Sequence, residues 1–246
     1  MHRFYITPDA IQGNQARISG QDARHLAKVL RLCVRDRVEL ADGQGKIFVA
    51  EITAMTPKEA CLALLEETTP EKESRVHIAV AQALIKEARM DDLIRPLTEL
   101  GINQWIPFAA GRSVPVPDPA RVQSRRERWE RIAREAIKQC GRTRIPEIHT
   151  PVSFDRILSL AGDYDLRVAF WERATCPVSS LRDREKPPPD RILILIGPEG
   201  GFSGQEIRMA ETHGFRSFSL GPRILRAETA TLTAVVLMQN LFGDLG

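Results

Sequence analysis

The sequence has few of the features that mark metal-binding, secreted or membrane-spanning proteins. Its four cysteines are scattered, with no Cys-x-x-Cys pair and no nearby histidine cluster at metal-ligand spacing, which favours buried thiols over a metal site. The longest aliphatic runs, ILILI and AVVLM, are much shorter than a membrane span, and the first residues contain no apolar segment of signal-peptide length. We therefore expect a cytoplasmic protein with no bound metal and no membrane partner.

The sequence also has little net charge, +3 over 246 residues, which by itself points to neither a nucleic-acid nor an acidic partner. The charge is distributed unevenly, however. Residues 121–144 contain nine basic and three acidic side chains, and residues 1–37 contain seven basic and three acidic ones. The net positive charge of these two segments together exceeds that of the whole chain. The basic charge is therefore concentrated, as a polyanion-binding surface requires.

Two regions with different patterns follow each other along the chain. Residues 38–65 alternate as short strands do, and Asp42-Gly43 predicts a hairpin because both residues tolerate a positive φ. The polar stretch EETTPEKES, residues 66–74, has no apolar anchor and is typical of a linker. We therefore expect a β domain over residues 1–70 and a second domain over residues 75–246.

The second region alternates strands with helices. VHIAVAQAL, QWIPF, LRVAFWE and RILILIG predict strands, and a helix between the first two is predicted to kink at Pro96 and to end at Gly101. An arginine-rich helix is predicted over residues 124–140, with one apolar stripe and the arginines on its other faces. This order is typical of an α/β fold, in which helices cover a mostly parallel sheet.

The arginine-rich helix has two interpretations. As a solvated surface helix, it would be held by Glu-Arg pairs four residues apart, such as Glu127 with Arg131 and Glu130 with Arg134. Its many arginine side chains would repel one another, however, and this favours contact with phosphates.

The stretch ILILIGPEGGFSGQE, residues 192–206, is the more specific local pattern. Its apolar run predicts a strand buried on both faces, and Gly197 stands at the carboxyl end, where open parallel sheets bind ligands. Ser203 and Glu206 match a capping box, so a helix should begin there and end at Gly214. The spacing fits neither a dinucleotide fingerprint nor a phosphate loop, which leaves a plain tight turn or a backbone cradle for a flat ligand.

A second glycine turn lies in SLGPRILRAETATLTAVVLMQNLF, residues 219–242. A short strand is predicted to end at Gly221, a turn then presents Arg226, and an apolar helix follows. An arginine buried near a strand end needs a partner, which is either a ligand or a structural ion pair with Glu228 or Glu199. If the two glycine turns are adjacent, they form one pocket.

IGPEGGFSGQE and LGPRILRAETA resemble the two C-terminal motifs of the RsmE family, which methylates N3 of one uridine in small-subunit ribosomal RNA, uracil 1498 in the usual numbering of 16S rRNA. HLAKVLRL, ADGQGKIF, TELGI, GRSV, RWERIAREAIKQCGR and PEI occur upstream in the family's order, so the resemblance covers nearly the whole chain. It implies an N-terminal PUA-like β-barrel that helps to hold RNA, followed by a SPOUT domain with a C-terminal trefoil knot. It also implies a homodimer with the C-terminal helix at the subunit interface.

The resemblance further implies that S-adenosylmethionine binds in the knot. Adenine is flat and is recognised at its edges, so backbone amides and carbonyls with aliphatic walls suit it. Carried over by motif, the predicted cofactor-binding residues are Leu195, Ile196, Gly197, Pro198, Glu199, Gly200, Gly201, Leu220, Gly221, Ile224, Leu225 and Arg226. Pro96 and Ala227 depart from the residues common in the family, without changing the cofactor motifs.

Methyl transfer to N3 of uracil requires an in-line approach and the loss of the N3 proton. Arg226 directly follows the second turn and is the first candidate to stabilise the charge that develops on the uracil carbonyls. Glu228 or Glu199 would accept the proton or orient that arginine. The residues predicted to grip phosphates around a uridine turned out of its stack are Arg112, Arg125, Arg128 and Arg131.

Two other functions remain open at the level of the sequence. One is a SPOUT enzyme that acts on transfer RNA or on another ribosomal site, and the other is an RNA-binding module whose pocket senses a cofactor without chemistry. Both naked 16S rRNA and the assembled small ribosomal subunit are candidate substrates of the enzyme.

Overall fold

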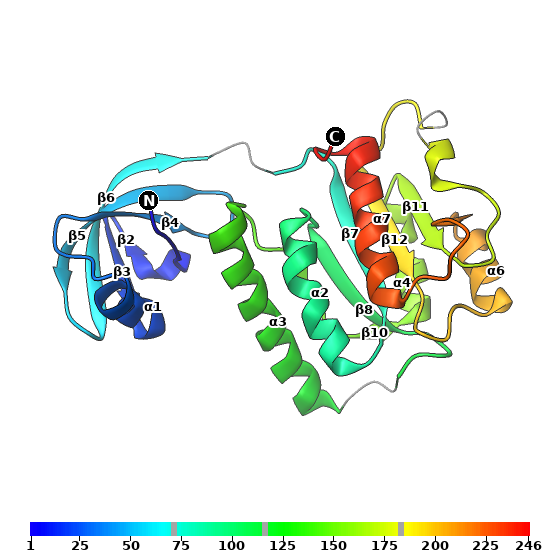
Figure 1. Ribbon diagram of the computed structural model, residues 1–246, viewed down its shortest axis with the longest axis horizontal. Coiled ribbons are helices and arrows are strands. Elements are labelled where there is room, and N and C mark those ends of the chain that lie inside the picture. Colours follow the sequence, from blue (N-terminus) through cyan, green and yellow to red (C-terminus); the bar gives the residue numbers. More distant parts are fainter. Residues whose placement is uncertain (70–72, 115–117, 182–184) are drawn as a thin grey trace. The chain divides into compact units, whose positions relative to one another are not determined.

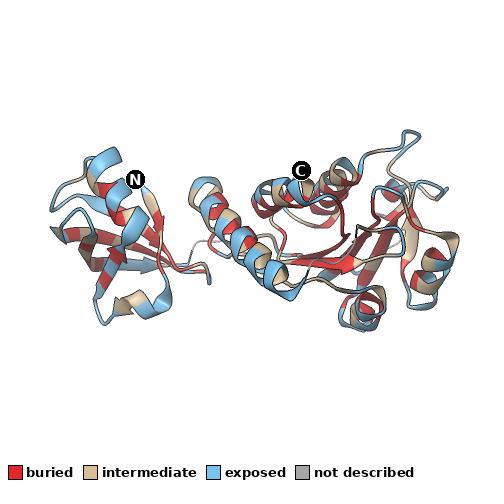
Figure 2. Ribbon diagram, turned by 90° about the horizontal axis from the view of Figure 1, so that it is seen from below, coloured by how far each residue is buried: buried red, intermediate tan, exposed pale blue. Residues whose placement is uncertain are grey.

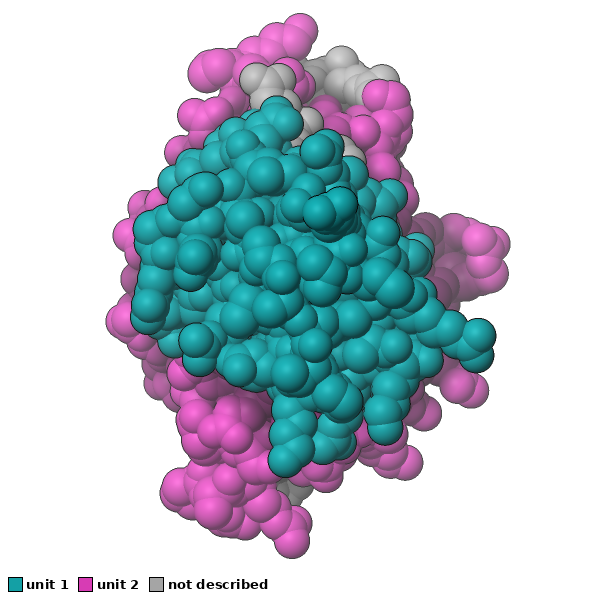
Figure 3. Space-filling view, turned by 90° about the vertical axis from the view of Figure 1, so that its left-hand side faces the viewer, with its two compact units in different colours: residues 1–73, 134–145 teal, residues 74–133, 146–246 magenta. Residues whose placement is uncertain are grey.

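The computed structural model describes residues 1–69, 73–114, 118–181 and 185–246, which form two compact units. The first unit consists of Met1–Glu73 and Arg134–Ile145, and the second of Ser74–Ala133 and Pro146–Gly246 (Figure 3). The N-terminal region was expected to contain no later segment of the chain. The structure adds to it the end of the arginine-rich helix and the loop that follows.

The first unit is built on a six-stranded sheet in the order β1-β4-β5-β6-β3-β2 (Figure 1). All of its strand pairs are antiparallel except β1 with β4. Alternate side chains, among them Phe4, Leu40 and Ile52, form a core on which α1 and η2 pack. The elements are β1 (Arg3–Tyr5), η1 (Pro8–Ala10), β2 (Ile11–Gln12), β3 (Gln15–Ser19), α1 (Gly20–Arg24), η2 (His25–Val29), β4 (Arg37–Ala41), β5 (Ile47–Met55) and β6 (Glu59–Thr68).

The strands predicted within residues 38–65 are confirmed, with differences at two connections. The hairpin of β4 and β5 is confirmed, but residues 42–46 form its loop rather than a two-residue turn. The Asp42 carboxylate holds this loop closed by accepting a hydrogen bond from the backbone N–H of Gln44 (2.7 Å). β6 continues to Thr68, into the stretch predicted as a linker, of which residues 70–72 lie outside the described parts of the chain.

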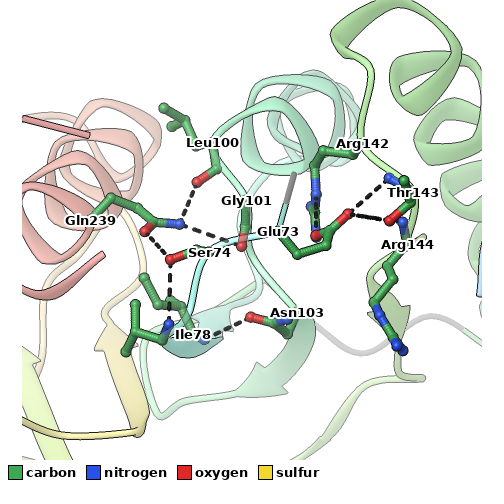
Figure 4. Close-up of polar contacts among 11 residues, drawn as sticks. Glu73, Ser74, Ile78, Leu100, Gly101, Asn103, Arg142, Thr143, Arg144 and Gln239 are labelled. Carbon is green, nitrogen blue, oxygen red and sulfur yellow. Dashed lines mark hydrogen bonds and ion pairs between the residues drawn. The ribbon is translucent and has the colours of Figure 1, made fainter. Parts of the chain in front are cut away.

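Glu73 attaches the second segment of this unit to the first. Its carboxylate accepts hydrogen bonds from Nη2 of Arg142 (2.7 Å) and from the backbone N–H groups of Thr143 (2.8 Å) and Arg144 (3.0 Å) (Figure 4). Burial by itself raises the pKa of Glu73, but the hydrogen bonds and charge of Arg142, together with the two N–H donors, outweigh it and hold the pKa below its ordinary value. Glu73 therefore binds this loop as a carboxylate.

The second unit contains a parallel sheet in the order β10-β8-β7-β12-β11-β13, with β9 also paired to β8. The predicted α/β fold is confirmed. The strands are β7 (His77–Ala83), β8 (Gln104–Ala109), β9 (Glu147–Ile148), β10 (Val152–Ser153), β11 (Leu166–Phe170), β12 (Arg191–Ile196) and β13 (Arg216–Phe218). The helical segments are α2 (Glu87–Glu99), the part of α3 (Pro119–Cys140) before Arg134, α4 (Phe154–Leu160), η3 (Ala161–Asp163), η4 (Val178–Ser180), α6 (Gly204–Thr212) and α7 (Ala227–Phe242).

Helices cover both faces of this sheet, so its central strands are buried throughout (Figure 2). On one face, Ile157 of α4 and Ile207 of α6 pack against alternate strand residues such as Leu195. On the other, α2 and α7 lie side by side over the sheet (Figure 1). Gln239 of α7 is fully buried there. Its side-chain oxygen accepts a hydrogen bond from Ser74 Oγ (2.8 Å), and its side-chain nitrogen donates one to the backbone oxygen of Leu100 (2.9 Å) (Figure 4).

The arginine-rich helix begins earlier than predicted, at Pro119, because Asp118 caps it by accepting a hydrogen bond from the backbone N–H of Arg121 (3.1 Å). Its apolar stripe is confirmed. Trp129 is buried and contacts Trp105 edge to face, with 4.7 Å between the ring centres. Helix α2 includes Pro96 and ends shortly after it.

The expectation of buried thiols is wrong. Cys33 is exposed in the loop before β4, and Cys61, Cys140 and Cys176 are partly exposed. Scattered spacing excludes a metal pattern but carries no information on burial. Within the described ranges, no three His, Cys, Asp or Glu side chains form a metal-ion group, and no helix is long and apolar enough to cross a membrane.

Candidate active site

A cavity of about 480 Å³ opens at the carboxyl ends of β11 and β12 in the second unit. Its walls come from the ends of these strands, from the glycine turn at residues 197–202, and from residues 219–226, which lead into α7. Its volume is in the range of about 300–1,000 Å³ that is usual for small-molecule sites. The two glycine turns are therefore adjacent and form one pocket.

The first glycine turn lines the cavity, and two of its residues leave little space for a side chain. A Cβ on Gly197 would lie 3.0 Å from the ring of Phe202. Gly201 has a φ of +66°, and a Cβ there would lie 2.8 Å from Oε1 of Glu172. Close packing therefore favours glycine at position 197, and the left-handed backbone favours it at position 201.

The predicted capping box closes this turn. The Ser203 hydroxyl accepts a hydrogen bond from the backbone N–H of Glu206 (3.2 Å), and the Glu206 carboxylate accepts one from the N–H of Ser203 (2.8 Å). The same carboxylate accepts the N–H of Gly111 (2.9 Å). Burial would raise the pKa of Glu206, but these donors and the charge of Arg112 hold it below its ordinary value. Arg112 in turn donates to the carbonyl of Gly200 (3.1 Å), so it contacts the glycine turn.

The second loop differs from the prediction in two respects. β13 ends at Phe218 rather than at Gly221, so the residues before α7 form a surface loop. Consequently Arg223 and Arg226 are exposed, and the expectation of buried arginines is wrong. Ile224, between them, is 84% exposed at the mouth of the cavity.

The carboxylates of the site pair with an arginine that the sequence analysis did not identify. Nη1 of Arg89, in the first turn of α2, lies 2.8 Å from Oε1 of Glu199 and 3.6 Å from Oε2 of Glu228. The alternative of a structural ion pair from Arg226 to these glutamates is therefore wrong. Oε2 of Glu228 is buried and accepts no hydrogen bond from the described residues.

The structure brings nearly all of the predicted cofactor-binding residues to the cavity. Leu195 is the exception, because it is buried in the sheet and packs toward α4 and α6. Glu228 is not a lining residue and reaches the site through Arg89. The predicted residues that line the cavity are Ile196, Gly197, Pro198, Glu199, Gly200, Gly201, Leu220, Gly221, Ile224, Leu225 and Arg226.

Several lining residues lie outside the predicted set. Trp171 and Glu172 follow β11, and the rule that pointed to the carboxyl end of β12 could have found them too. The ring N–H of Trp171 is buried and has no hydrogen-bond partner within the described ranges. Arg89 had no local signal, because only the packing of α2 beside α7 brings it to the pocket.

The predicted RNA-binding arginines of α3 are placed differently from one another. Arg125 pairs with Glu87 of α2 (2.5 Å between Nη2 and Oε2), and Arg128 pairs with Asp91 (3.0 Å between Nη2 and Oδ2). Arg131 is exposed. Acidic residues of the neighbouring helix α2 therefore compensate part of the positive charge of α3. The surface-helix interpretation expected this compensation from Glu-Arg pairs within α3.

Comparison with known proteins gives consistent matches over the chain. A family model for an RNA methyltransferase domain matches residues 72–239, and a model for an RNA methyltransferase PUA domain matches residues 18–65. The protein named ribosomal RNA small subunit methyltransferase E of Bacillus subtilis is 32% identical, over 96% of this chain and 94% of its own length. The chain belongs to the RsmE family of RNA methyltransferases.

Solved structures of similar proteins agree with this membership. A ribosomal RNA small subunit methyltransferase E from Neisseria gonorrhoeae, solved bound to S-adenosylmethionine, superposes with a TM-score of 0.86 at 29% identity over the whole of both chains. A protein from Legionella pneumophila, solved in complex with the same cofactor, gives a TM-score of 0.89 at 31% identity, over 99% of this chain and 98% of its own. The two RsmE motifs recognised in the sequence are the two loops that form the cavity.

Proposed function

We propose that this RsmE-family enzyme transfers a methyl group from S-adenosylmethionine to N3 of one specific uridine in 16S ribosomal RNA, in the cytoplasm. One observation carries the proposal: both family motifs meet in a single cavity at the carboxyl ends of β11 and β12. The similarity to ribosomal RNA methyltransferases over nearly the full chain supports the substrate class.

The residues of the cavity fit the cofactor. The backbone N–H groups of Glu199 and Gly200 are not engaged in the described hydrogen bonds and can recognise a flat base, and Ile196, Leu220 and Leu225 provide aliphatic walls. A Cβ at Gly197 or Gly201 would crowd a neighbouring side chain, so glycine at these positions favours a close approach of the backbone to a ligand. When bound, S-adenosylmethionine supplies an electrophilic methyl group.

The charged residues at the cavity suit the chemistry of uracil N3. This nitrogen carries a proton that must leave as its lone pair is used, and negative charge then develops on the flanking carbonyls. Arg226 is exposed at the mouth of the cavity, where its guanidinium can donate to these oxygens. Glu199 lines the cavity and is the better placed of the two glutamates to accept the proton.

The finer architecture and the assembly also belong to this proposal. Residues 1–70 form a PUA-like barrel that helps to hold RNA, and residues 75–246 form a SPOUT domain. The segment from β13 through α7 threads into a trefoil knot around the cofactor pocket, and α7 lies at the interface of a homodimer. The adjacency of the two C-terminal loops supports the knot, and the exposed apolar side chain of Val236 on α7 supports the interface.

Labelled S-adenosylmethionine tests the substrate. The protein is incubated with assembled small ribosomal subunits, with naked 16S rRNA and with transfer RNA, and the methylated nucleotide is mapped by mass spectrometry of digested RNA. We expect one modified uridine in 16S rRNA. Methylation of transfer RNA or of another ribosomal nucleotide would support the alternative SPOUT activity, and binding without transfer would support a cofactor-sensing module.

Replacing Arg226 by alanine tests its catalytic role. We expect the single-turnover rate to fall by roughly 10²–10³, as for other donors that stabilise a developing oxyanion, while the affinity for RNA changes little. Arg208→Ala is the matched control, since Arg208 is exposed on α6 and does not line the cavity. If Arg226→Ala bound cofactor and RNA normally and kept the full rate, the assignment would be wrong.

A further inference from the structure

Arg89 connects three segments of the second unit that are far apart in the sequence. It lies in the first turn of α2, Glu199 lies in the first glycine turn, and Glu228 lies in the first turn of α7. Nη1 of Arg89 is 2.8 Å from Glu199 and 3.6 Å from Glu228, and its side chain also lines the cavity. One guanidinium therefore joins both loops that form the pocket.

The two carboxylates depend on this cation in different ways. Glu199 forms a direct hydrogen bond with Arg89. Glu228 Oε2 is too far for one, yet it is buried and accepts no other hydrogen bond within the described ranges, so Arg89 provides its compensating charge. Without Arg89, two negative charges would remain beside the pocket, and each would disfavour the present position of the other.

One nitrogen, Nη1, contacts both carboxylates, so the position of this atom matters as well as its charge. Arginine presents several donors in a rigid plane, whereas lysine carries one compact ammonium on a flexible stem. The side chains of Arg89, Glu199 and Glu228 are between a quarter and about a third exposed, so solvent screens part of their attraction. The contribution of Arg89 is therefore mainly to hold both loops in place rather than to stabilise the whole fold.

We infer that Arg89 is a positioning residue for methyl transfer, which fixes the first glycine turn through Glu199 and the start of α7 through Glu228 and so sets the shape of the cofactor pocket. This inference rests on the proposed function. It assigns Glu228 to the support of Arg89, and it leaves Glu199 as the carboxylate that faces the ligand.

The experiment compares the wild-type protein with Arg89→Gln, Arg89→Lys, Glu228→Gln and the double variant Arg89→Gln/Glu228→Gln. Calorimetry measures the affinity for S-adenosylmethionine, and circular dichroism measures the melting temperature. The single-turnover rate is measured at saturating cofactor with the small ribosomal subunit as substrate. We expect Arg89→Gln to weaken cofactor binding about tenfold, which corresponds to about 1.4 kcal/mol. Arg89→Lys should recover only part of this loss.

The double variant separates positioning from general stability. Because Glu228→Gln removes the charge that Arg89→Gln leaves without a partner, we expect the double variant to bind cofactor more tightly than Arg89→Gln. A purely structural role would lower the melting temperature and give losses that add. Arg95→Gln is the matched control, since Arg95 is exposed on the same helix and does not line the cavity; it should match wild type in all three measurements.

Each outcome decides the inference. The inference is overturned if Arg89→Gln keeps its cofactor affinity and rate within about twofold of wild type. It is also overturned if the double variant binds cofactor more weakly than Arg89→Gln. If Arg89→Gln does not fold, full affinity in Arg89→Lys together with wild-type behaviour of Glu228→Gln overturns it in the same way. Failure of the wild-type protein to bind S-adenosylmethionine overturns the proposed function itself, and the inference with it.

Discussion

Gly201 combines a backbone constraint with a steric one. Its φ of +66° lies in the left-handed region, and an added Cβ would be 2.8 Å from Oε1 of Glu172, which also lines the cavity. We expect Gly201→Ala to lower the free energy of unfolding by about 1–2 kcal/mol because an L-residue is strained there. The affinity for S-adenosylmethionine should fall as well, because Glu172 must move. Urea unfolding and calorimetry measure the two effects.

A matched glycine lies three residues further along the chain. Gly204 begins α6 with an ordinary backbone, and a Cβ there would meet Nη1 of Arg208 at 3.4 Å, a normal contact. We expect Gly204→Ala to leave cofactor affinity unchanged and stability equal or slightly higher. A Gly201→Ala protein that is as stable and binds as tightly as Gly204→Ala would show that the turn tolerates a side chain.

The residues that sequence analysis identified correctly are those whose role is local. The capping box of Ser203 and Glu206 depends on a spacing of three residues, and the glycine turn depends on the end of one strand. Arg89 could not be predicted, because its partners come from two other segments. An ion pair with Glu228 or Glu199 was one alternative for Arg226, and in the structure Arg89 forms it.

At the scale of elements, α3 is a basic helix whose charge is partly compensated by α2. Arg125 and Arg128 pair with acidic residues of α2, whereas Arg131 is exposed. If this helix contacts phosphates, Arg131→Gln should weaken RNA binding and reduce the slope of log affinity against log salt by roughly 0.7–0.9. Arg125→Gln should reduce it less, because Glu87 already compensates the charge of Arg125. Filter binding of 16S rRNA fragments over a range of salt concentrations measures the slopes.

Cofactor binding provides the internal control for that experiment. Both substitutions lie on α3, away from the residues that line the cavity, so calorimetry with S-adenosylmethionine should give the wild-type affinity. Equal salt slopes for wild type and Arg131→Gln would show that this face of α3 is a solvated surface, as the simpler interpretation of its sequence held.

The attachment of the loop after α3 should depend on pH through Glu73. Burial raises its pKa, but the bonds and charge of Arg142 and the N–H groups of Thr143 and Arg144 outweigh this and lower it. A lowered native pKa contributes stability at pH above the ordinary value of 4.5, and the contribution is lost as the pH falls through the native pKa. We therefore expect Glu73→Gln to be less stable than wild type at neutral pH, by about 1–3 kcal/mol, with a smaller difference in acid.

Urea unfolding of both proteins, from about pH 7 down to about pH 3, measures this dependence. Glu66→Gln serves as a control, since Glu66 is exposed on β6 and its loss should change stability little at any pH. A stability difference between wild type and Glu73→Gln that stays constant over the whole range would exclude a linked carboxylate at this position.

For the whole molecule, the order of elements was predictable and the grouping of segments was not. Apolar residues that repeat every two positions predicted the strands, and those that repeat every three to four positions predicted the helices. Each repeat reflects which side of a single element is buried. The assignment of residues 134–145 to the first unit depends instead on bonds from Arg142 and Thr143 to Glu73, across some 70 residues of sequence. No local pattern carries such a contact.

The proposed homodimer gives a prediction at this scale. Val236 on α7 and Leu245 just after it are 40% and 41% exposed, and Leu232, Leu237 and Leu241 are only half-buried. Apolar side chains gathered on one helix are typical of an interface, because their exposure to water is unfavourable in free energy. An aspartate placed among them would have to be desolvated on association. We expect Val236→Asp to weaken the dimer by about thirtyfold or more.

Sedimentation velocity over a range of concentrations measures the association. Val236→Ala is the matched variant: it removes apolar area without adding charge, so it should weaken the dimer only slightly. Because α7 also borders the cofactor cavity through Ala227 and Ala230, dissociation should lower the affinity for S-adenosylmethionine in parallel with the loss of dimer. A Val236→Asp protein that still sediments as a dimer would place the interface on another surface, and a monomeric wild-type protein would refute the proposed assembly.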